Sequence, residues 1–304
     1  TGNHVWAGRY DREMIDIFDV QDEITRNVVA SMQTQIQIAE AVNAEITERV
    51  SLPVWALVNK SWKLLYEMTD ESLIASIAAA EEAVRLDPGG GRSNQALASG
   101  LFHHGWLGFA PDPKASYERA LKFSERSVRA SPNNEYARWS LGMLRLVHGE
   151  HDKAIAELSR AIEINPNCSI AYGALATCQN FAGFPDQAIA NNEIAIRSNP
   201  RDPTVFYRYT GIGISYYLIG RLDEAIDWLA KAVHMKPEFF PAHAILIASF
   251  HEAGLSDECQ RSLENCLQSI PSVSLKPVRE MPFRRHQHKE RLLETLLAAG
   301  LPSD

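Results

Sequence analysis

Prolines at nearly regular intervals divide most of this chain into units of similar length. The spacings between six of them are 44, 34, 34, 37 and 34 residues. A spacing of 34 residues that occurs three times indicates an internal repeat. Each proline ends an apolar stretch of helical periodicity, because proline has no amide hydrogen to donate within a helix. These prolines are Pro88, Pro132, Pro166, Pro200, Pro237 and Pro271.

Small residues recur five and twelve positions before these prolines, and small side chains allow two helix backbones to approach closely. A glycine stands seventeen positions before four of the prolines, and glycine tolerates the positive φ found at helix ends. Each unit is therefore predicted to be two antiparallel helices joined at that glycine. The residues are Ser76, Ala83, Ala120, Ser127, Ala154, Ala161, Ala188, Ala195, Ala225, Ala232, Cys259 and Cys266, with Gly149, Gly183, Gly220 and Gly254.

This pattern resembles the tetratricopeptide repeat. The best match is Tyr209-x-x-Ile212-Gly213-x-x-Tyr216, followed by Ala225-x-x-x-Leu229, Ala232 and Pro237. The resemblance implies an all-α fold, a right-handed α-solenoid in which stacked antiparallel helix pairs share a continuous core. We expect repeats over 54–271, with units at about 54–88, 92–132, 135–166, 169–200, 203–237 and 240–271. Extra residues are expected near 108–114 and 201–203.

Different segments are expected on either side of the repeats. Residues 1–12 indicate a remnant strand or linker of an upstream α/β domain. Residues 13–50 predict a long amphipathic helix packing on the solenoid, since apolar residues recur every three or four positions from Val20 to Ile46. A dimerising coiled coil is the alternative for this helix. Residues 272–304 are expected to form C-terminal capping helices, the last at about 287–299.

Both flanks resemble parts of bacterial multidomain regulators. The N-terminal resemblance lies in Val5-Trp-Ala-x-Arg-Tyr and in Ile17-Phe-Asp-Val-Gln-Asp-Glu-Ile24, and the C-terminal one includes Met281-Pro-Phe283 and the leucines before Pro302. It implies an upstream class III adenylate/guanylate cyclase domain or a winged-helix DNA-binding domain, and it does not choose between them. Because the chain opens without Met, we expect it to be a fragment of such a longer protein.

Composition narrows the environment and the partners. The chain is 45% hydrophobic and 22% charged, which is ordinary for a folded protein. Its net charge of −8 argues against nucleic-acid binding by this segment. No run of eighteen apolar residues and no signal peptide occurs, so no membrane association is expected. Four cysteines without a CxxC pair predict reduced thiols in a cytoplasmic protein.

The sequence lacks the common motifs of catalysis and cofactor binding. It has no Gly-Lys-Ser/Thr of a phosphate-binding loop and no Gly-x-Ser-x-Gly. His251-Glu252 lacks the second histidine of a zinc-binding helix. A cyclase needs paired acidic residues to hold two metal ions, and the acidic residues here are scattered. We therefore expect no catalysis, cofactor or metal within this fragment, whatever its parent protein does.

In the tetratricopeptide family the first helix of each unit lines a concave groove, and the resemblance therefore assigns candidate binding residues. They are largely aromatic or neutral, and they lack the Lys and Asn pattern with which co-chaperone members bind a C-terminal carboxylate. We expect a protein or peptide ligand anchored by aromatic side chains. Alternatively, these side chains pack between helices or lie under the N-terminal helix. The candidates are Phe102, Tyr136, Trp139, Met143, Asn180, Tyr207, Ile214, Tyr217 and His251.

A basic cluster precedes and enters the last predicted helix. Such a cluster is either the solvated face of a cap or a site for an anion or an acidic partner. Its candidate members are Arg279, Arg284, Arg285 and Lys289.

Two functions stay open on the sequence. The first is a non-catalytic interaction or scaffold module whose concave aromatic groove binds a protein or peptide of unknown identity, its own upstream domains included. The second is a regulatory or oligomerising segment of an adenylate/guanylate cyclase, in cyclic nucleotide signalling, or of a winged-helix transcription regulator. A homodimer is compatible with both.

Overall fold

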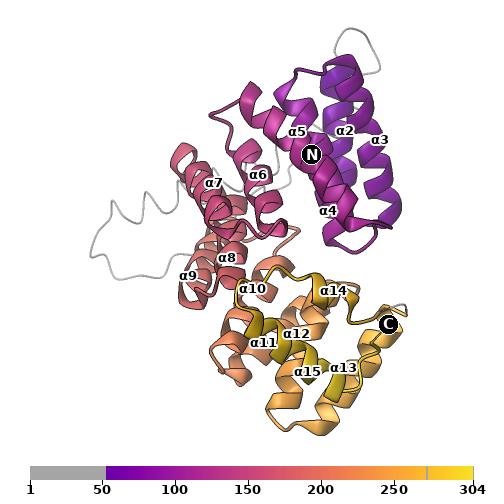
Figure 1. Ribbon diagram of the computed structural model, residues 1–304, viewed down its shortest axis with the longest axis vertical. Helices are drawn as coiled ribbons and strands as arrows, with labels where there is room; N and C mark the ends of the chain where they lie inside the picture. The colour runs from indigo at the N-terminus through magenta and orange to yellow at the C-terminus, as the bar shows by residue number, and fades with distance from the viewer. Residues whose placement is uncertain (1–52, 272, 304) are drawn as a thin grey trace, which may run out of the picture. The chain divides into compact units, whose positions relative to one another are not determined.

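Helices make up all the regular secondary structure in the computed structural model, which describes residues 53–271 and 273–303 (Figure 1). No strand occurs in those two ranges. In chain order the helices are α2 (Pro53–Glu67), α3 (Asp70–Leu86), α4 (Gly91–Trp106), α5 (Pro113–Ala130), α6 (Glu135–Val147), α7 (His151–Ile164), α8 (Ser169–Ala182), α9 (Pro185–Ser198), α10 (Phe206–Leu218), α11 (Leu222–Met235), α12 (Phe240–Glu252), α13 (Ser256–Ser269), α14 (Lys276–Glu280) and α15 (His286–Ala298).

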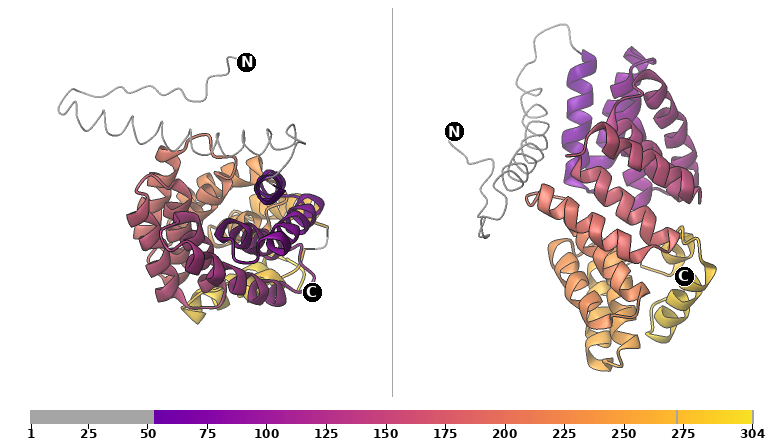
Figure 2. Two further views of the ribbon diagram at one scale, coloured as in Figure 1. Left: turned by 90° about the horizontal axis from the view of Figure 1, so that it is seen from above. Right: turned by 90° about the vertical axis from the view of Figure 1, so that its left-hand side faces the viewer.

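The chain divides into two compact units. Among the described residues, unit 1 holds those up to Leu144 together with Glu157–Ala171 and Ile196–Pro203. Unit 2 holds Arg145–Ala156, Tyr172–Ala195 and the residues from Thr204 onward. Within each unit, helices that follow one another in the chain pack side by side, as α2 to α5 do in unit 1 and α10 to α13 in unit 2 (Figure 2).

The small residues predicted to mark close helix contacts are buried. All twelve positions, five and twelve residues before the six prolines, are at most 5% exposed. The position five residues before the proline has a second role at the end of the helix. Its carbonyl accepts the amide hydrogen of the residue directly before the proline, as between Asp87 and Ala83 (2.9 Å) and between Ile270 and Cys266 (2.8 Å). The same residues therefore set the helix spacing and terminate the second helix of a pair.

Glycines with positive φ join the two helices of a pair, as the sequence predicts. The φ angle is +74° at Gly149, +90° at Gly183, +79° at Gly220 and +73° at Gly254. The first pair has no glycine at its turn, and Met68 takes a φ of 54° there instead. The Met68 side chain packs with Leu65 and Leu73 in an apolar cluster that holds it in that conformation. Trp62 and Leu107 pack against this cluster.

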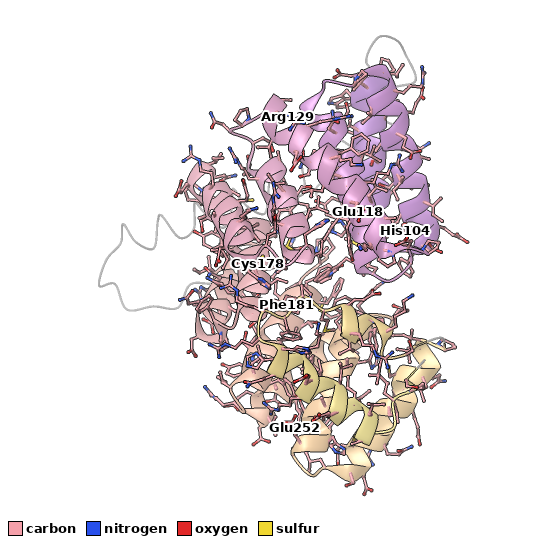
Figure 3. All side chains as sticks on the ribbon, in the orientation of Figure 1. His104, Glu118, Arg129, Cys178, Phe181 and Glu252 are labelled. Atoms are coloured by element: carbon pink, nitrogen blue, oxygen red, sulfur yellow. The ribbon has the colours of Figure 1, made fainter. Side chains whose placement is uncertain are left out.

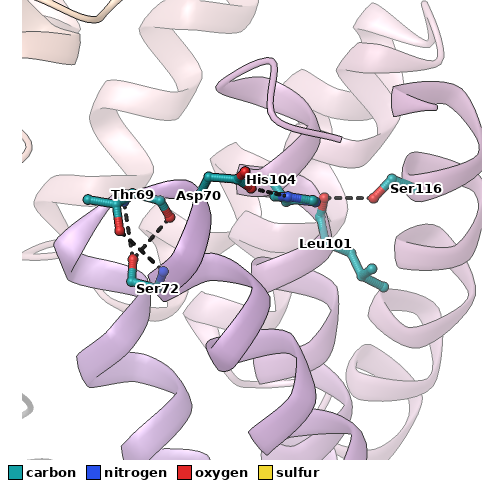
Figure 4. Close-up of polar contacts among 6 residues, drawn as sticks. All are labelled: Thr69, Asp70, Ser72, Leu101, His104 and Ser116. Atoms are coloured by element: carbon teal, nitrogen blue, oxygen red, sulfur yellow. Dashed lines mark hydrogen bonds and ion pairs between the residues drawn. The ribbon is translucent and has the colours of Figure 1, made fainter. Parts of the chain in front are cut away.

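Polar contacts hold one end of the first helices of unit 1 together (Figure 4). Thr69 caps α3, since its hydroxyl oxygen accepts the Ser72 amide hydrogen at 3.2 Å and its own amide donates to Ser72 Oγ at 3.1 Å. His104 Nε2, at the end of α4, lies 2.9 Å from Asp70 Oδ1 in the first turn of α3. Ser116 Oγ of α5 donates to the Leu101 carbonyl oxygen at 3.0 Å.

The connections between pairs differ in length where the sequence spacing differs. Residues 165–168 and 236–239 connect α7 to α8 and α11 to α12, whereas 199–205 separate α9 from α10. The longer link contains the extra residues expected near 201–203. The extra residues of the second unit lie in the turn between α4 and α5, where Gly108 has a φ of +83°.

The flanking segments can be compared with expectation only in part. The predicted strand or linker at 1–12 and the predicted helix at 13–50 lie outside the described residues. At the C-terminal end, the short α14 and the longer α15 follow the last repeat pair. Among the described residues, no helix combines the length and the apolarity that crossing a membrane requires.

Replacing Gly213 with alanine is expected to destabilise unit 2. An alanine Cβ there would lie 2.4 Å from Cγ of the fully buried Leu229, so α10 and α11 would have to move apart. We expect the crowding in Gly213→Ala to cost about 1–3 kcal/mol, offset in part by the roughly 1 kcal/mol that alanine gains in helix propensity, for a net loss of up to about 2 kcal/mol. Thermal unfolding followed by circular dichroism measures the change.

Gly89→Ala is the control, because no atom lies within 4 Å of an added Cβ at that position. Equal melting temperatures for the two variants would contradict the close helix contact at Gly213.

Candidate interaction surface

The chain returns across unit 2 after the last repeat pair. We call residues Met281–Arg285, which connect α14 to α15, the strap. The strap amide of Arg284 donates to the carbonyl oxygen of Phe181 at 2.8 Å, at the end of α8. His151 Nε2, at the start of α7, donates to the carbonyl oxygen of Pro282 at 2.6 Å. The backbone of the strap is thus bound at two points by residues more than a hundred positions earlier.

Side chains of the strap also meet the ends of the repeat helices. The Phe283 ring packs edge-on against Phe181, with ring centroids 4.9 Å apart (Phe181 is labelled in Figure 3). Arg284 Nη2 lies 2.6 Å from Asp152 Oδ1. The Arg285 side chain lies over Gly183, where an added Cβ would be 3.1 Å from its Nε. The strap therefore buries an aromatic ring and places two arginines beside the turns of the repeats.

A hollow adjoins this contact. Gly149–Lys153, at the start of α7, line one side of it, and Phe283 and Arg284 line the other. The side chain of Asp152 is 87% exposed there, even though it pairs with Arg284. Glu150 is held by Arg145 at 2.6 Å and Lys153 at 2.8 Å, and these hydrogen bonds lower the pKa of its carboxyl group. Asp152 is thus the more accessible carboxylate of the hollow.

Glu252, labelled in Figure 3, lies at the end of α12 and is the centre of a polar cluster that attaches α15. Its carboxylate accepts hydrogen bonds from the Tyr217 hydroxyl at 2.6 Å, Arg291 Nε at 2.9 Å and Thr295 Oγ1 at 3.2 Å. Arg291 also pairs with the second carboxylate oxygen, and its guanidinium lies 4.8 Å from the centre of the Tyr217 ring. Burial opposes the charged form of Glu252, but the donors outweigh it and lower the pKa of the carboxyl group.

The predicted groove residues of unit 2 have different environments. Tyr217 is buried and belongs to the cluster just described. Asn180 is buried as well and ties α8 to α10, because its Nδ2 donates to the Gly211 carbonyl at 2.7 Å and its Oδ1 accepts from Ser215 Oγ at 2.7 Å. Ile214 is buried, Tyr207 is half-buried and His251 is exposed. The Tyr207 ring packs against Phe206 and Phe239.

The predicted groove residues of unit 1 belong to an aromatic cluster. The Phe102 ring stacks on Trp106 at 5.5 Å and meets Trp139 edge-on at 6.4 Å. The neighbouring His103 ring lies 5.8 Å from Trp139. Phe102, Trp139 and Met143 are buried, whereas Tyr136 is half-buried. Of the nine candidates, half-buried Tyr136 and Tyr207 and exposed His251 are therefore the ones that are not fully buried.

The predicted basic cluster makes contacts within unit 2. Besides the pair of Arg284 with Asp152, Arg279 Nη1 donates to the Ser303 carbonyl at 3.1 Å, and Lys289 Nζ donates to the Arg279 carbonyl at 3.2 Å. Arg285 lies against Gly183. Arg284 and Arg285 thus contact the repeats, whereas Arg279 and Lys289 make contacts within the C-terminal segment. An external anion or acidic partner for these residues remains a prediction.

Sequence reasoning missed the residues that receive this segment, namely His151, Asp152, Phe181 and Glu252. Phe181 directly follows the groove candidate Asn180, and Glu252 directly follows the candidate His251. The predicted positions therefore differ by one residue from those that contact the C-terminal segment. Among the described residues, no three or more His, Cys, Asp or Glu side chains come together as a metal site would require. The four cysteines are free and buried.

Comparisons with known proteins agree with this architecture. The tetratricopeptide repeat family matches residues 114–167 and 181–238. The human IFIT1 dimer with m7Gppp-AAAA superimposes with a TM-score of 0.64 at 18% identity, covering 90% of this chain and 65% of that one. The Pseudomonas aeruginosa pilF structure gives a TM-score of 0.50 at 13% identity, covering 78% and 97%. Residues 114–167 and 181–238 therefore carry tetratricopeptide repeats, and the fold is an α-solenoid of that type.

One sequence relative is named "Putative adenylate cyclase 3" of Rhizobium meliloti (strain 1021). It is 27% identical over 159 residues, which are 50% of this chain and 27% of that protein. The match thus spans about a quarter of the relative's length.

The Glu252–Arg291 pair is expected to couple more strongly than an exposed ion pair. A double-mutant cycle with Glu252→Gln and Arg291→Met should give about 1–2 kcal/mol, because the same carboxylate also accepts from Tyr217 in a partly buried site. The exposed pair Arg160–Glu163, with side chains 53% and 63% exposed, is the control and should give about 0.2–0.5 kcal/mol. Unfolding free energies from urea titration measure both, and equal coupling would refute the special role of Glu252.

Buried His103 is expected to make unit 1 less stable in mild acid. Burial lowers the pKa of His103 to about 4, against the opposing effect of its hydrogen bond to the Ser99 carbonyl. In the unfolded chain a histidine has a pKa of about 6.5, so between pH 6.5 and pH 4 only the unfolded state takes up the proton. His103 should therefore cost no stability above pH 6.5 and about 2 kcal/mol at pH 5.

Melting temperatures at pH 7.5 and pH 5 measure this effect in the wild type and in His103→Gln. The variant should lose less stability on acidification than the wild type does, whereas exposed His234→Gln should behave like the wild type. An unchanged pH dependence in His103→Gln would contradict the assignment.

Proposed function

We propose that this chain is a non-catalytic protein-interaction module that binds a protein or peptide segment on its repeat helices. The observation that carries the proposal is the tetratricopeptide architecture combined with aromatic side chains that keep exposed surface on first helices, Tyr136 on α6 and Tyr207 on α10. Tyrosine is favoured at binding hot spots because it offers a large contact area with few rotatable bonds. Its partners include upstream domains of its own protein and a second copy of the chain.

A peptide or protein ligand accounts for the surface better than a nucleic acid does. The IFIT1 structure contains m7Gppp-AAAA, but an identity of 18% supports the fold alone. Nucleic-acid binding needs lysines and arginines that neutralise phosphates, and this chain has a net charge of −8. The basic residues of the C-terminal segment already donate to groups within unit 2.

A regulatory or oligomerising role in a cyclase is the second candidate function. The Rhizobium meliloti relative and its name favour it over a role in a winged-helix regulator. In this case the solenoid would transmit partner binding to a catalytic domain for cyclic nucleotide signalling. Free, buried cysteines suit the reducing cytoplasm in which such signalling proteins work.

Selection of peptides from a displayed random library on the immobilised chain tests the interaction function. We expect a family of related sequences whose affinity falls tenfold or more in Tyr136→Ala or in Tyr207→Ala, as for an aromatic hot spot. Phe123→Ala is the matched control, since Phe123 is a half-buried aromatic residue on α5, a second helix. Enrichment of no sequence, or equal loss in the control, would count against the proposal.

A further inference from the structure

We propose that the strap, Met281–Arg285, is an intramolecular ligand that occupies a peptide-binding surface of unit 2. The surface consists of His151, Asp152, Phe181 and Gly183. The partner that fits it is an extended protein segment in which an aromatic residue precedes an arginine, and this partner binds by displacing the strap. The inference rests on the proposed function and gives it a partner class and a mode of control.

The contacts of the strap are those of a bound peptide. It is non-helical between α14 and α15, and its backbone is recognised at two points, the Pro282 carbonyl by His151 and the Arg284 amide by the Phe181 carbonyl. Backbone hydrogen bonds of this kind provide affinity for any extended segment, and side-chain contacts provide selectivity. Here the selective contacts are the Phe283 ring on Phe181 and the Arg284 guanidinium on Asp152.

The strap can leave without the C-terminal helices leaving. Apolar anchors stand on both sides of it, Val278 in α14 and Leu292 and Leu296 in α15, and all three are fully buried. Glu252 holds α15 through Arg291 and Thr295. Release of the strap itself breaks one backbone hydrogen bond, to the Phe181 carbonyl, and the hydrogen bond of the His151 side chain to the Pro282 carbonyl. It also exposes the Phe283 ring, frees Arg285 from Gly183 and breaks one ion pair, whose arginine and aspartate side chains are 35% and 87% exposed. An ion pair this exposed contributes little to stability.

Room for a partner exists beside the strap. The hollow at the start of α7 is bordered by Phe283 and Arg284 on one side and by Gly149–Lys153 on the other. An incoming segment can therefore contact Asp152 from the hollow before the strap has fully detached. The chemistry of the hollow suits a basic side chain, because Asp152 is its most exposed carboxylate.

Competition by the strap determines how much the affinity for a free peptide should rise when the strap is released. A segment tethered at both ends has an effective concentration on the order of 1 mM. If a free peptide of the same sequence binds the empty surface with a Kd of about 100 μM, the tethered strap weakens its apparent affinity about tenfold. Removal of the strap's side-chain contacts should restore that factor.

The test uses the full 304-residue chain and a fluorescein-labelled peptide with the sequence of residues 279–287. Fluorescence anisotropy measures its Kd for the wild type and for the double variant Phe283→Ala/Arg284→Ala. We expect the double variant to bind the peptide about tenfold more tightly than the wild type does. Adding Asp152→Asn to the double variant should weaken its peptide binding about threefold, and a peptide with alanine in place of its Phe and second Arg should bind neither chain.

Matched controls separate strap release from general loosening. Phe123→Ala/Arg126→Ala removes another aromatic–arginine contact, with the guanidinium 5.3 Å from the ring centre on α5, and should leave peptide binding at the wild-type level. Arg284→Ala alone removes only an exposed side chain, so it keeps the fold if the double variant does not, and it should give a gain of about threefold. Equal affinities of the wild type, Arg284→Ala and a folded double variant would overturn the proposal.

The experiments distinguish failure of the strap proposal from failure of the broader interaction function. Library peptides that bind the wild type and depend on Tyr136 or Tyr207, without any gain on strap release, would refute the strap as a ligand and leave the interaction function intact. If release of the strap raises the affinity for the strap peptide but no library peptide is enriched, the strap surface is supported as a binding site. The proposed role of the two tyrosines then loses its support.

Discussion

Close approach of helices at small residues is the constraint on which the rest of this structure depends. Alanine, serine or cysteine occupies the same two positions in all six repeat pairs, and every one of these residues is buried. A larger side chain there would separate the helices and leave voids along the whole contact, which close-packed interiors do not tolerate. Because each helix packs on the helix before it and the helix after it, as from α2 to α5 and from α10 to α13, each unit is stabilised by stacking.

The same regularity explains which parts of the structure were predictable from the sequence. Positions such as Ala225 and Gly220 recur at fixed distances from a proline, so their roles could be inferred by comparing one repeat with the next. Exposure of the groove candidates could not be inferred in this way. Tyr217 is covered by Arg291, and Phe181 by Phe283, through contacts between residues 74 and 102 positions apart. No local pattern encodes such a return of the chain, since it depends on where the last repeat ends.

The partners of the basic residues could not be predicted from the sequence either. A cluster of arginines in sequence indicates a charged surface, and the sequence left open whether solvent or an acidic partner faces it. In the structure Arg284 meets Asp152, which lies 132 positions earlier, and Arg279 meets a backbone carbonyl. The partner of a long, flexible cation is set by tertiary structure, and the exposed fraction of the pair then decides how much it contributes.

The two parts of the C-terminal segment differ in how strongly they are held, because α15 makes more buried contacts than the strap does. The α15 helix is fixed by buried leucines and by a carboxylate that accepts from three side chains at once. The strap is fixed by one ring contact, two hydrogen bonds to its backbone, the contact of Arg285 with Gly183 and a solvent-exposed ion pair. Local stability follows the density of buried contacts, so the strap opens at a lower free-energy cost than the helices that flank it. A segment that opens locally between two firm anchors exposes a binding surface while the solenoid stays folded, and its tethering keeps that surface closed to ligands that bind less tightly than the strap does.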